Sequence, residues 1–233
     1  MSDALKIVYR FSSATAPSGE FSVRLDAATL EVEQAPRLTL PDWTRLDTER
    51  CPDCPLANSA TTHCPMAIAL IDLLEYSATI DSFSPLAVSV EMPEREIHAT
   101  VTAQRAISSL MGLLIATCAC PDVSWLRPMA RFHQPLASEE ETIYRATSSY
   151  LLAQYFRQQS GEEPDFSLAG LSMRYQRLHQ INIAMAARLR GAIERDASVN
   201  AVVLLDLFAK AMPYSVNDSV AELEYLFEAY RPT

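Results

Sequence analysis

Short runs of alternating apolar and polar residues dominate the N-terminal part of the chain. They cover residues 5–12 (LKIVYRFS), 20–25 (EFSVRL), 30–33, 86–91 (LAVSVE) and 96–102 (EIHATVT). Alternation with a period of two is typical of β-strands that bury one side and expose the other. We therefore expect a small antiparallel sheet with one covered face.

At Cys64 the spacing of apolar residues changes to that of a helix. The residues that recur at helical spacing are Met66, Leu70, Leu73, Leu74 and Ile80. Pro65 suits the first position of a helix, which makes Cys64 the expected N-cap residue. A helix is thus predicted between the second and third long strands, inserted into the sheet region.

Beyond residue 102 the pattern predicts helices only. Residues 103–118 are apolar almost all round, which is typical of a central, buried helix. Within it Ser108, Gly112 and Ala116 lie four residues apart, a spacing that lets a neighbouring helix approach closely. The further predicted helices cover residues 138–159, 167–194, 198–211 and 216–230. The first of these begins with acidic residues, which favour a helix N-terminus.

These elements predict an α+β fold: a small N-terminal antiparallel sheet with an inserted helix, followed by an all-helical C-terminal half. Residues 1–102 form the β-rich region with a cysteine-rich loop, and residues 103–233 form the helical region. We expect the two regions to share one core. A chain of 233 residues, of which 49% are hydrophobic, can bury such a core unaided.

The net charge limits the partners that we expect, and the N-terminal pattern limits the expected location. The net charge of −10 argues against general nucleic-acid binding and against an anionic membrane surface. The N-terminus lacks the pattern of a secretory signal, and the most apolar stretch, residues 107–120, is shorter than the about 20 residues that span a bilayer. We expect a cytoplasmic protein that binds an unknown protein partner or a small anionic ligand, with neither nucleic acid nor a membrane as partner.

Three of the five cysteines lie in the segment CPDCPLANSATTHCP, residues 51–65. In a reducing compartment, clustered cysteines are more often metal ligands or redox groups than disulfides. Cys51 and Cys54 have the spacing of a chelating pair, and Cys64 lies at a predicted helix N-terminus that stabilises a thiolate. Three thiolate ligands favour zinc, with an iron–sulfur cluster as the less expected occupant.

A tetrahedral site needs a fourth ligand. The candidates are Cys118, Cys120, His63, His98 and His133. His63 is adjacent to Cys64, and neighbouring residues rarely reach the same metal ion. Cys120 ends the buried helix just before Pro121, and we favour it as the fourth ligand. Two other interpretations stay open: ordinary buried thiols, and a redox pair or disulfide, as in a thiol redox sensor.

Several segments resemble an uncharacterised family of bacterial proteins, a domain of unknown function. They are CPDCPL, HCPMA, AQRAISSLMGL, CPDVSWLRPMARFHQPLASEEETIYRA, YLLAQYF and NAVVLLDLFA, which together run over nearly the whole chain. The family carries no assigned activity, so the resemblance implies a context and not a function. Its members end the buried helix with Ser-Gly-Cys-Pro, and the match falls on Cys120, which supports that residue over Cys118.

A second candidate site lies in the segment RPMARFHQP. Arg127 and Arg131 could hold a phosphate or carboxylate, with His133 as a proton-transfer group. Alternatively, the arginines pair with the acidic residues 139–141 at the next helix start. The polar residues of helix 167–194 are expected on a solvated face or in pairs between helices.

Catalytic motifs are absent from the sequence. It contains no G-x-S-x-G elbow, no phosphate-binding loop and no H-E-x-x-H, and its five glycines form no glycine-rich loop. The sequence thus favours a noncatalytic interaction or regulatory module with a structural zinc site. The alternatives are an enzyme or binding protein for a small anionic ligand, using the loop of Arg127, Arg131 and His133, and a thiol redox sensor.

Overall fold

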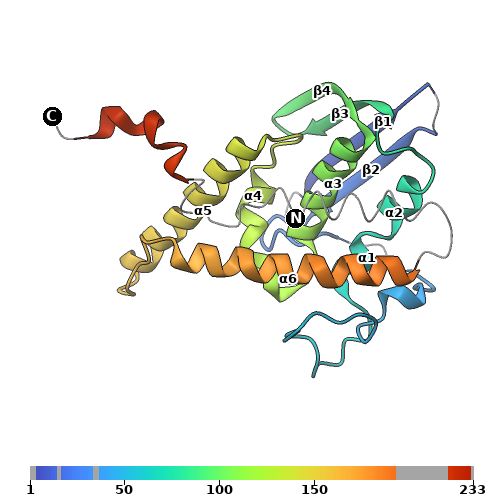
Figure 1. Cartoon of the computed structure of the whole chain (residues 1–233), viewed down its shortest axis with the longest axis horizontal. Helices are drawn as coiled ribbons and strands as arrows, with labels where there is room; N and C mark the ends of the chain where they lie inside the picture. Colours follow the sequence, from blue (N-terminus) through green and yellow to red (C-terminus); the bar gives the residue numbers. More distant parts are fainter. Residues whose placement is uncertain (1–3, 15–16, 34–36, 193–219, 232–233) are drawn as a thin grey trace.

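The structure, a computed structural model, describes residues 4–14, 17–33, 37–192 and 220–231 (Figure 1). The predicted helix over residues 198–211 lies outside the described residues. The α+β architecture is confirmed: strands occupy the N-terminal part and helices follow.

Four antiparallel strands form one sheet in the order β2-β1-β3-β4. Their bounds are β1 Leu5–Ser12, β2 Gly19–Leu25, β3 Pro85–Met92 and β4 Arg95–Thr102. The alternation works as predicted, because Ile7, Tyr9 and Phe11 on β1 are buried whereas Lys6 and Arg10 face water. The run 30–33, however, is not a strand. It contributes a single bridge to the end of β2.

The predicted inserted helix exists but is broken in two. Helix α1 spans Pro65–Ala69 and α2 spans Ile71–Ser77, with Leu70 between them. Cys64 is the N-cap residue of α1 and Pro65 its first residue, as predicted. The chain before α1 contains a short 3-10 helix, η1, at Asp42–Thr44.

Helix α3, Ala103–Thr117, is the central helix that the sequence predicts. It contacts β3 and β4 and lies between the sheet and the long helix α6, Ala169–Ala192 (Figure 1). A 3-10 helix, η2 (Pro121–Leu126), and the short helix α4 (Arg127–Arg131) follow α3 and lead to α5, Glu139–Gln159. Residues 224–230 form a 3-10 helix, η3, instead of the expected α-helix.

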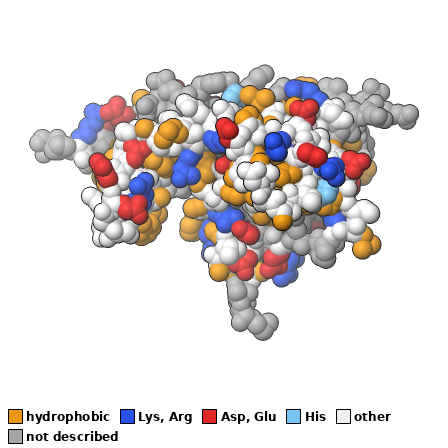
Figure 2. Space-filling model, turned by 90° about the horizontal axis from the view of Figure 1, so that it is seen from below, with side chains coloured by type: hydrophobic (Ala, Val, Ile, Leu, Met, Phe, Trp, Pro, Cys, Tyr) orange, Lys and Arg blue, Asp and Glu red, His pale blue; other side chains and the backbone are white. Residues whose placement is uncertain are grey.

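One hydrophobic core unites the two regions. Tyr9 from the sheet, Leu70 from the inserted segment, Leu110 from α3 and Leu178 from α6 all belong to it. On the face in Figure 2, charged side chains of both signs are interspersed with hydrophobic ones. No single helix among the described residues is long and apolar enough to cross a membrane. One bent pair, residues 103–117 with 121–131, reaches that length and hydropathy only when joined across a bend of 115°.

Candidate functional site

The four cysteines predicted as metal ligands share a local feature. Each is followed directly by proline: Cys51-Pro52, Cys54-Pro55, Cys64-Pro65 and Cys120-Pro121. In two of these pairs the proline is the first residue of a helical segment, so Cys64 is the N-cap residue of α1 and Cys120 that of η2. All five cysteines are free thiols.

The electrostatics place these thiols in one region. Burial raises the pKa of Cys51 to about 11, and charge on Cys64 or Cys54 would raise it further. Burial likewise raises the pKa of Cys120 to about 12, with further contributions from Cys64, Asp122 and Cys51. Cys51 is therefore close enough to Cys54 and Cys64, and Cys120 to Cys51 and Cys64, for charge on those thiols to act on it.

The side chains do not stand in a ligating arrangement. Within the part of the chain that the structure describes, no three or more His, Cys, Asp or Glu side chains form a group that could hold a metal ion. The thiols of residues 51, 54, 64 and 120 thus share a region without converging on one point. Their role as zinc ligands stays a prediction.

The other candidate ligands have different partners. The thiol of Cys118 is fully buried and donates to the Ile115 carbonyl at 3.1 Å. Among the histidines, His63 Nδ1 is hydrogen-bonded to the Thr44 hydroxyl at 2.8 Å, and His98 lies on β4 with its ring 3.2 Å from Glu96. The sulfur of Cys120 accepts a hydrogen bond from the Asp122 amide, and that of Cys118 accepts one from the Cys120 amide.

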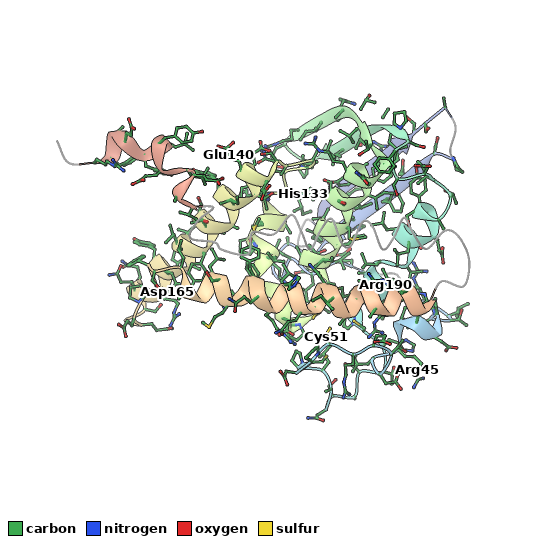
Figure 3. All side chains as sticks on the ribbon, in the orientation of Figure 1. Arg45, Cys51, His133, Glu140, Asp165 and Arg190 are labelled. Atoms are coloured by element: carbon green, nitrogen blue, oxygen red, sulfur yellow. The ribbon has the colours of Figure 1, made fainter. Side chains whose placement is uncertain are left out.

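Arg177 of α6 joins two of the cysteine turns. Its guanidinium donates to the carbonyls of Pro52 and Asp53, at 2.6 and 3.2 Å, inside the Cys51–Cys54 loop. The same group donates to the carboxylate of Asp122, at 2.7 and 3.1 Å, just after Cys120. Arg177 belongs to α6, and Figure 3 shows Cys51 beside this helix. One side chain thereby fixes the first turn relative to the second.

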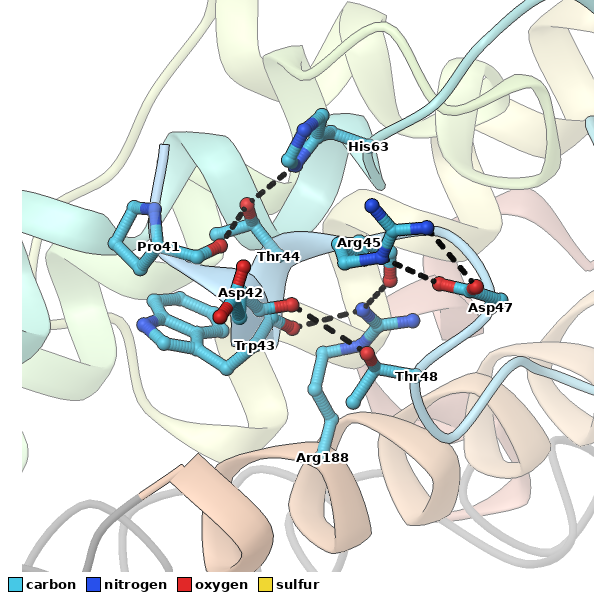
Figure 4. Close-up of polar contacts among 9 residues, drawn as sticks. All are labelled: Pro41, Asp42, Trp43, Thr44, Arg45, Asp47, Thr48, His63 and Arg188. Atoms are coloured by element: carbon cyan, nitrogen blue, oxygen red, sulfur yellow. Dashed lines mark hydrogen bonds and ion pairs between the residues drawn. The ribbon is translucent and has the colours of Figure 1, made fainter. Parts of the chain in front are cut away.

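A second arginine of α6 fixes the preceding segment. Arg188 is only 2% exposed and donates from one nitrogen to the carbonyls of Trp43, at 2.9 Å, and Arg45 (Figure 4). Asn182, between the two arginines, is 1% exposed. The expectation of a solvated face is wrong for Arg188 and Asn182, which are buried. The expectation of pairs between helices holds for Arg177, which is paired with Asp122 of η2.

The structure separates the three residues of the predicted anion pocket. Arg127 is paired with Glu31 at 2.6 Å, and Arg131 lies 3.6 Å from Glu94. His133 lines a cavity of about 250 Å³ among α3, α4, α5 and α6, and neither arginine lines that cavity. The alternative interpretation expected the two arginines to pair with the acidic residues 139–141. They pair with glutamates, but these are Glu31 and Glu94.

A hydrogen-bonded group crosses from the sheet to this cavity. The Tyr9 hydroxyl on β1 lies 2.9 Å from the Ser109 hydroxyl of α3 and 2.5 Å from Nε2 of His133. Ser109 also accepts the amide of Leu136 at 2.8 Å. Burial, and to a smaller extent the cation of Arg145, lowers the pKa of His133 to about 3, so its ring is neutral at pH 7.

Two more cavity residues carry unused hydrogen-bond donors. Arg145 of α5 donates through one nitrogen, Nη2, to the carbonyls of Met129 and Phe132, at 2.6 and 3.0 Å. Among the described residues, no carboxylate pairs with it and its other two nitrogens have no hydrogen-bond partner. The hydroxyl of Tyr175, a residue 7% exposed, likewise has no hydrogen bond to another described residue.

A comparison with known families decides where the chain belongs. The family described as "Domain of unknown function (DUF6901)" matches residues 7–228. The chain belongs to this family. No curated protein and no solved structure matches it. The family match spans both the cysteine region and the cavity, so each is part of the family domain.

Two features of this family member were within reach of sequence reasoning. The repeated Cys-Pro pair separates the four predicted ligands from Cys118, which is followed by alanine. The motif Cys-Pro-Asp occurs twice, at residues 51–53 and 120–122, and both copies bind Arg177. The role of that arginine itself left no local signal, because its partners lie far away along the chain.

Proposed function

We propose that the chain is a noncatalytic, cytoplasmic interaction or regulatory module whose loops are held by a structural zinc ion on Cys51, Cys54, Cys64 and Cys120. The observation that carries this proposal is the bridge from Arg177 to both Cys-Pro-Asp turns. It holds the first chelating pair against the turn that bears the fourth thiol. Zinc would cross-link the same segments from the side of the sulfurs.

Burial raises the pKa of Cys51 and Cys120, but neighbouring groups partly oppose this effect. Asp122 donates its amide to the sulfur of Cys120, and the cations of Arg177 and Arg188 act on Cys51. A metal must displace the thiol protons, so binding releases protons and weakens as the pH falls. The proposal requires the four sulfurs to come within about 2.3 Å of one zinc ion.

An all-thiolate site supports a structural role over a catalytic one. Structural zinc sites are filled by protein ligands, whereas catalytic sites keep an open position. A surface for a partner is also available. The exposed large apolar side chains on α5 are Tyr144, Leu151, Leu152, Tyr155 and Phe156. Several exposed apolar side chains on one helix are a candidate surface for protein–protein contact.

The alternatives have less support. A thiol redox sensor needs an accessible thiolate, but burial raises the pKa of the metal-free Cys51 and Cys120 thiols to about 11 and about 12. An anion-binding loop needs free cations, but Arg127 and Arg131 are close to Glu31 and Glu94.

Elemental analysis of the purified full chain tests the zinc site directly. We expect one zinc per chain, no visible absorption of the kind an iron–sulfur cluster gives, and a lower melting temperature after chelation. Cys54→Ser and Cys120→Ser should each lose the metal. Arg177→Met should keep a weaker site, because the sulfurs remain while the turns are no longer fixed to each other.

Cys118→Ala is the matched control. It removes the one cysteine whose thiol bonds to the helix carbonyl of Ile115, so it should retain a full equivalent of zinc. A metal-free wild-type protein whose melting temperature does not respond to chelator or to added zinc would refute the proposal. Loss of zinc in Cys118→Ala with retention in Cys120→Ser would refute the ligand set.

A further inference from the structure

The cavity among α3, α4, α5 and α6 has an apolar wall made by small residues. Ser108, Gly112 and Ala116, four residues apart on α3, all line it. Among the described residues, their short side chains leave space along this face of α3. Leu113 of α3 and Leu178 of α6 complete this wall, which suits the apolar body of a ligand.

Most polar groups of the cavity are hydrogen-bonded within the protein, but two residues keep donors that are not. Arg145 has two nitrogens without a partner among the described residues, and the buried Tyr175 hydroxyl has none. Both residues line the cavity together with Arg105. The one carboxylate among the lining residues is Glu139, an exposed residue in the first turn of α5.

The nearby acidic residue does not neutralise Arg145. The carboxylate of Glu141 accepts the amide of Ser138 at 2.7 Å and the side chain of Gln134 at 2.5 Å. It acts on Arg145 only through space. A partly buried guanidinium without a carboxylate partner is costly unless an anion completes its hydrogen bonds.

We propose that this cavity binds a small carboxylic acid with an apolar body, its carboxylate on Arg145 and the Tyr175 hydroxyl and its body against the small residues of α3. The class follows from the chemistry of the lining, which combines the cation of Arg145 and the Tyr175 hydroxyl with apolar side chains. The neutral His133 ring, which is hydrogen-bonded to Tyr9, also forms part of the lining.

The size of the cavity limits the ligand. At about 250 Å³ it lies below the about 300–1,000 Å³ of pockets for drug-sized molecules. Short branched acids and single-ring aromatic acids fit this class, whereas nucleotides and long-chain fatty acids exceed it. The ligand is independent of the zinc proposal, since none of the predicted metal ligands lines the cavity.

Isothermal titration of the full-length protein with benzoate, and with benzyl alcohol as its uncharged analogue, tests the proposal. We expect benzoate to bind and the alcohol to bind at least about tenfold more weakly, since tenfold corresponds to 1.4 kcal/mol, the lower end of a charge-assisted hydrogen bond. Arg145→Met should reduce benzoate affinity by about tenfold or more. Ser108→Leu should abolish binding of both compounds, because its side chain fills the cavity.

Arg131→Met is the matched control, because it removes a nearby arginine that does not line the cavity. It should bind benzoate like the wild type. Since Arg145 also supports the Met129 and Phe132 carbonyls, circular dichroism must show that its variant is folded, and Ser108→Leu provides a test that leaves those bonds in place. Equal affinity for benzoate and benzyl alcohol, no heat with benzoate at millimolar concentration, or unchanged binding by Ser108→Leu would overturn the proposal.

Discussion

The neutral histidine beneath the cavity makes the stability of the fold depend on pH. His133 is hydrogen-bonded to the Tyr9 hydroxyl at 2.5 Å. Burial, and to a smaller extent the nearby cation of Arg145, lowers the pKa of His133 to about 3. In the unfolded chain a histidine has a pKa of about 6.5. Between these two values the unfolded chain binds a proton that the folded protein does not, so stability falls as the pH drops through this range.

The magnitude follows from the two pKa values. Each unit of difference corresponds to about 1.4 kcal/mol. At pH 7 both states are neutral at this residue and it contributes no pH dependence. At pH 4.5, two units below the unfolded value, the folded state has lost about 3 kcal/mol relative to pH 7. The loss reaches its limit near pH 3. A domain with about 5–15 kcal/mol of total stability would lose a large fraction of it.

Urea unfolding, followed by circular dichroism at several pH values from 7 to 4.5, measures this effect. Carboxylates titrate in the same range, so the informative quantity is the difference between the wild type and His133→Gln, which cannot take up the proton. Between pH 7 and pH 4.5, we expect the free energy of unfolding to fall by about 3 kcal/mol less in His133→Gln than in the wild type. His98→Gln is the control, because that ring is exposed on β4. Parallel pH curves for the wild type and His133→Gln would refute the reasoning.

Two further substitutions test how the helices are fixed. Ser138 caps α5 by accepting the amide of Glu141, whose carboxylate accepts the Ser138 amide in return; Ser138→Ala should lower the free energy of unfolding by about 1 kcal/mol, and an unchanged urea midpoint would contradict this. Arg188→Met should cost about 2–3 kcal/mol in the same assay, because the carbonyls of Trp43 and Arg45 lose the buried cation that donates to them. A stability equal to that of the wild type would show that those carbonyls find other partners.

The sheet and the central helix could be predicted because their signals are local. Alternation in β1 and β3 reports directly which side chains face the core, and the uniformly apolar run of α3 indicates burial on all sides. The break at Leu70 escaped prediction because apolar residues continue at helical spacing across it. The run 30–33 has the composition of a strand but forms only one bridge.

The candidate sites could be predicted only in part. The prolines that follow Cys64 and Cys120 indicate that these two cysteines are N-cap residues. Arg177 and Arg188 occupy positions that a helical count assigns to the polar face, yet their long side chains reach carbonyls more than a hundred residues earlier in the chain. The cavity depends on the relative placement of four helices, and no local pattern specifies that.

The strand order has a consequence for synthesis of the chain. β1 pairs with β2 at once through a short connection, but its other neighbour, β3, follows only after residues 26–84. Until that segment has left the ribosome, the hairpin presents an unpaired edge, a ready template for association with another chain. The cysteine loop lies within residues 26–84. A metal bound early by the first three thiols would draw the intervening chain together. It would thereby lower the loop-closure entropy lost when β3 pairs with β1.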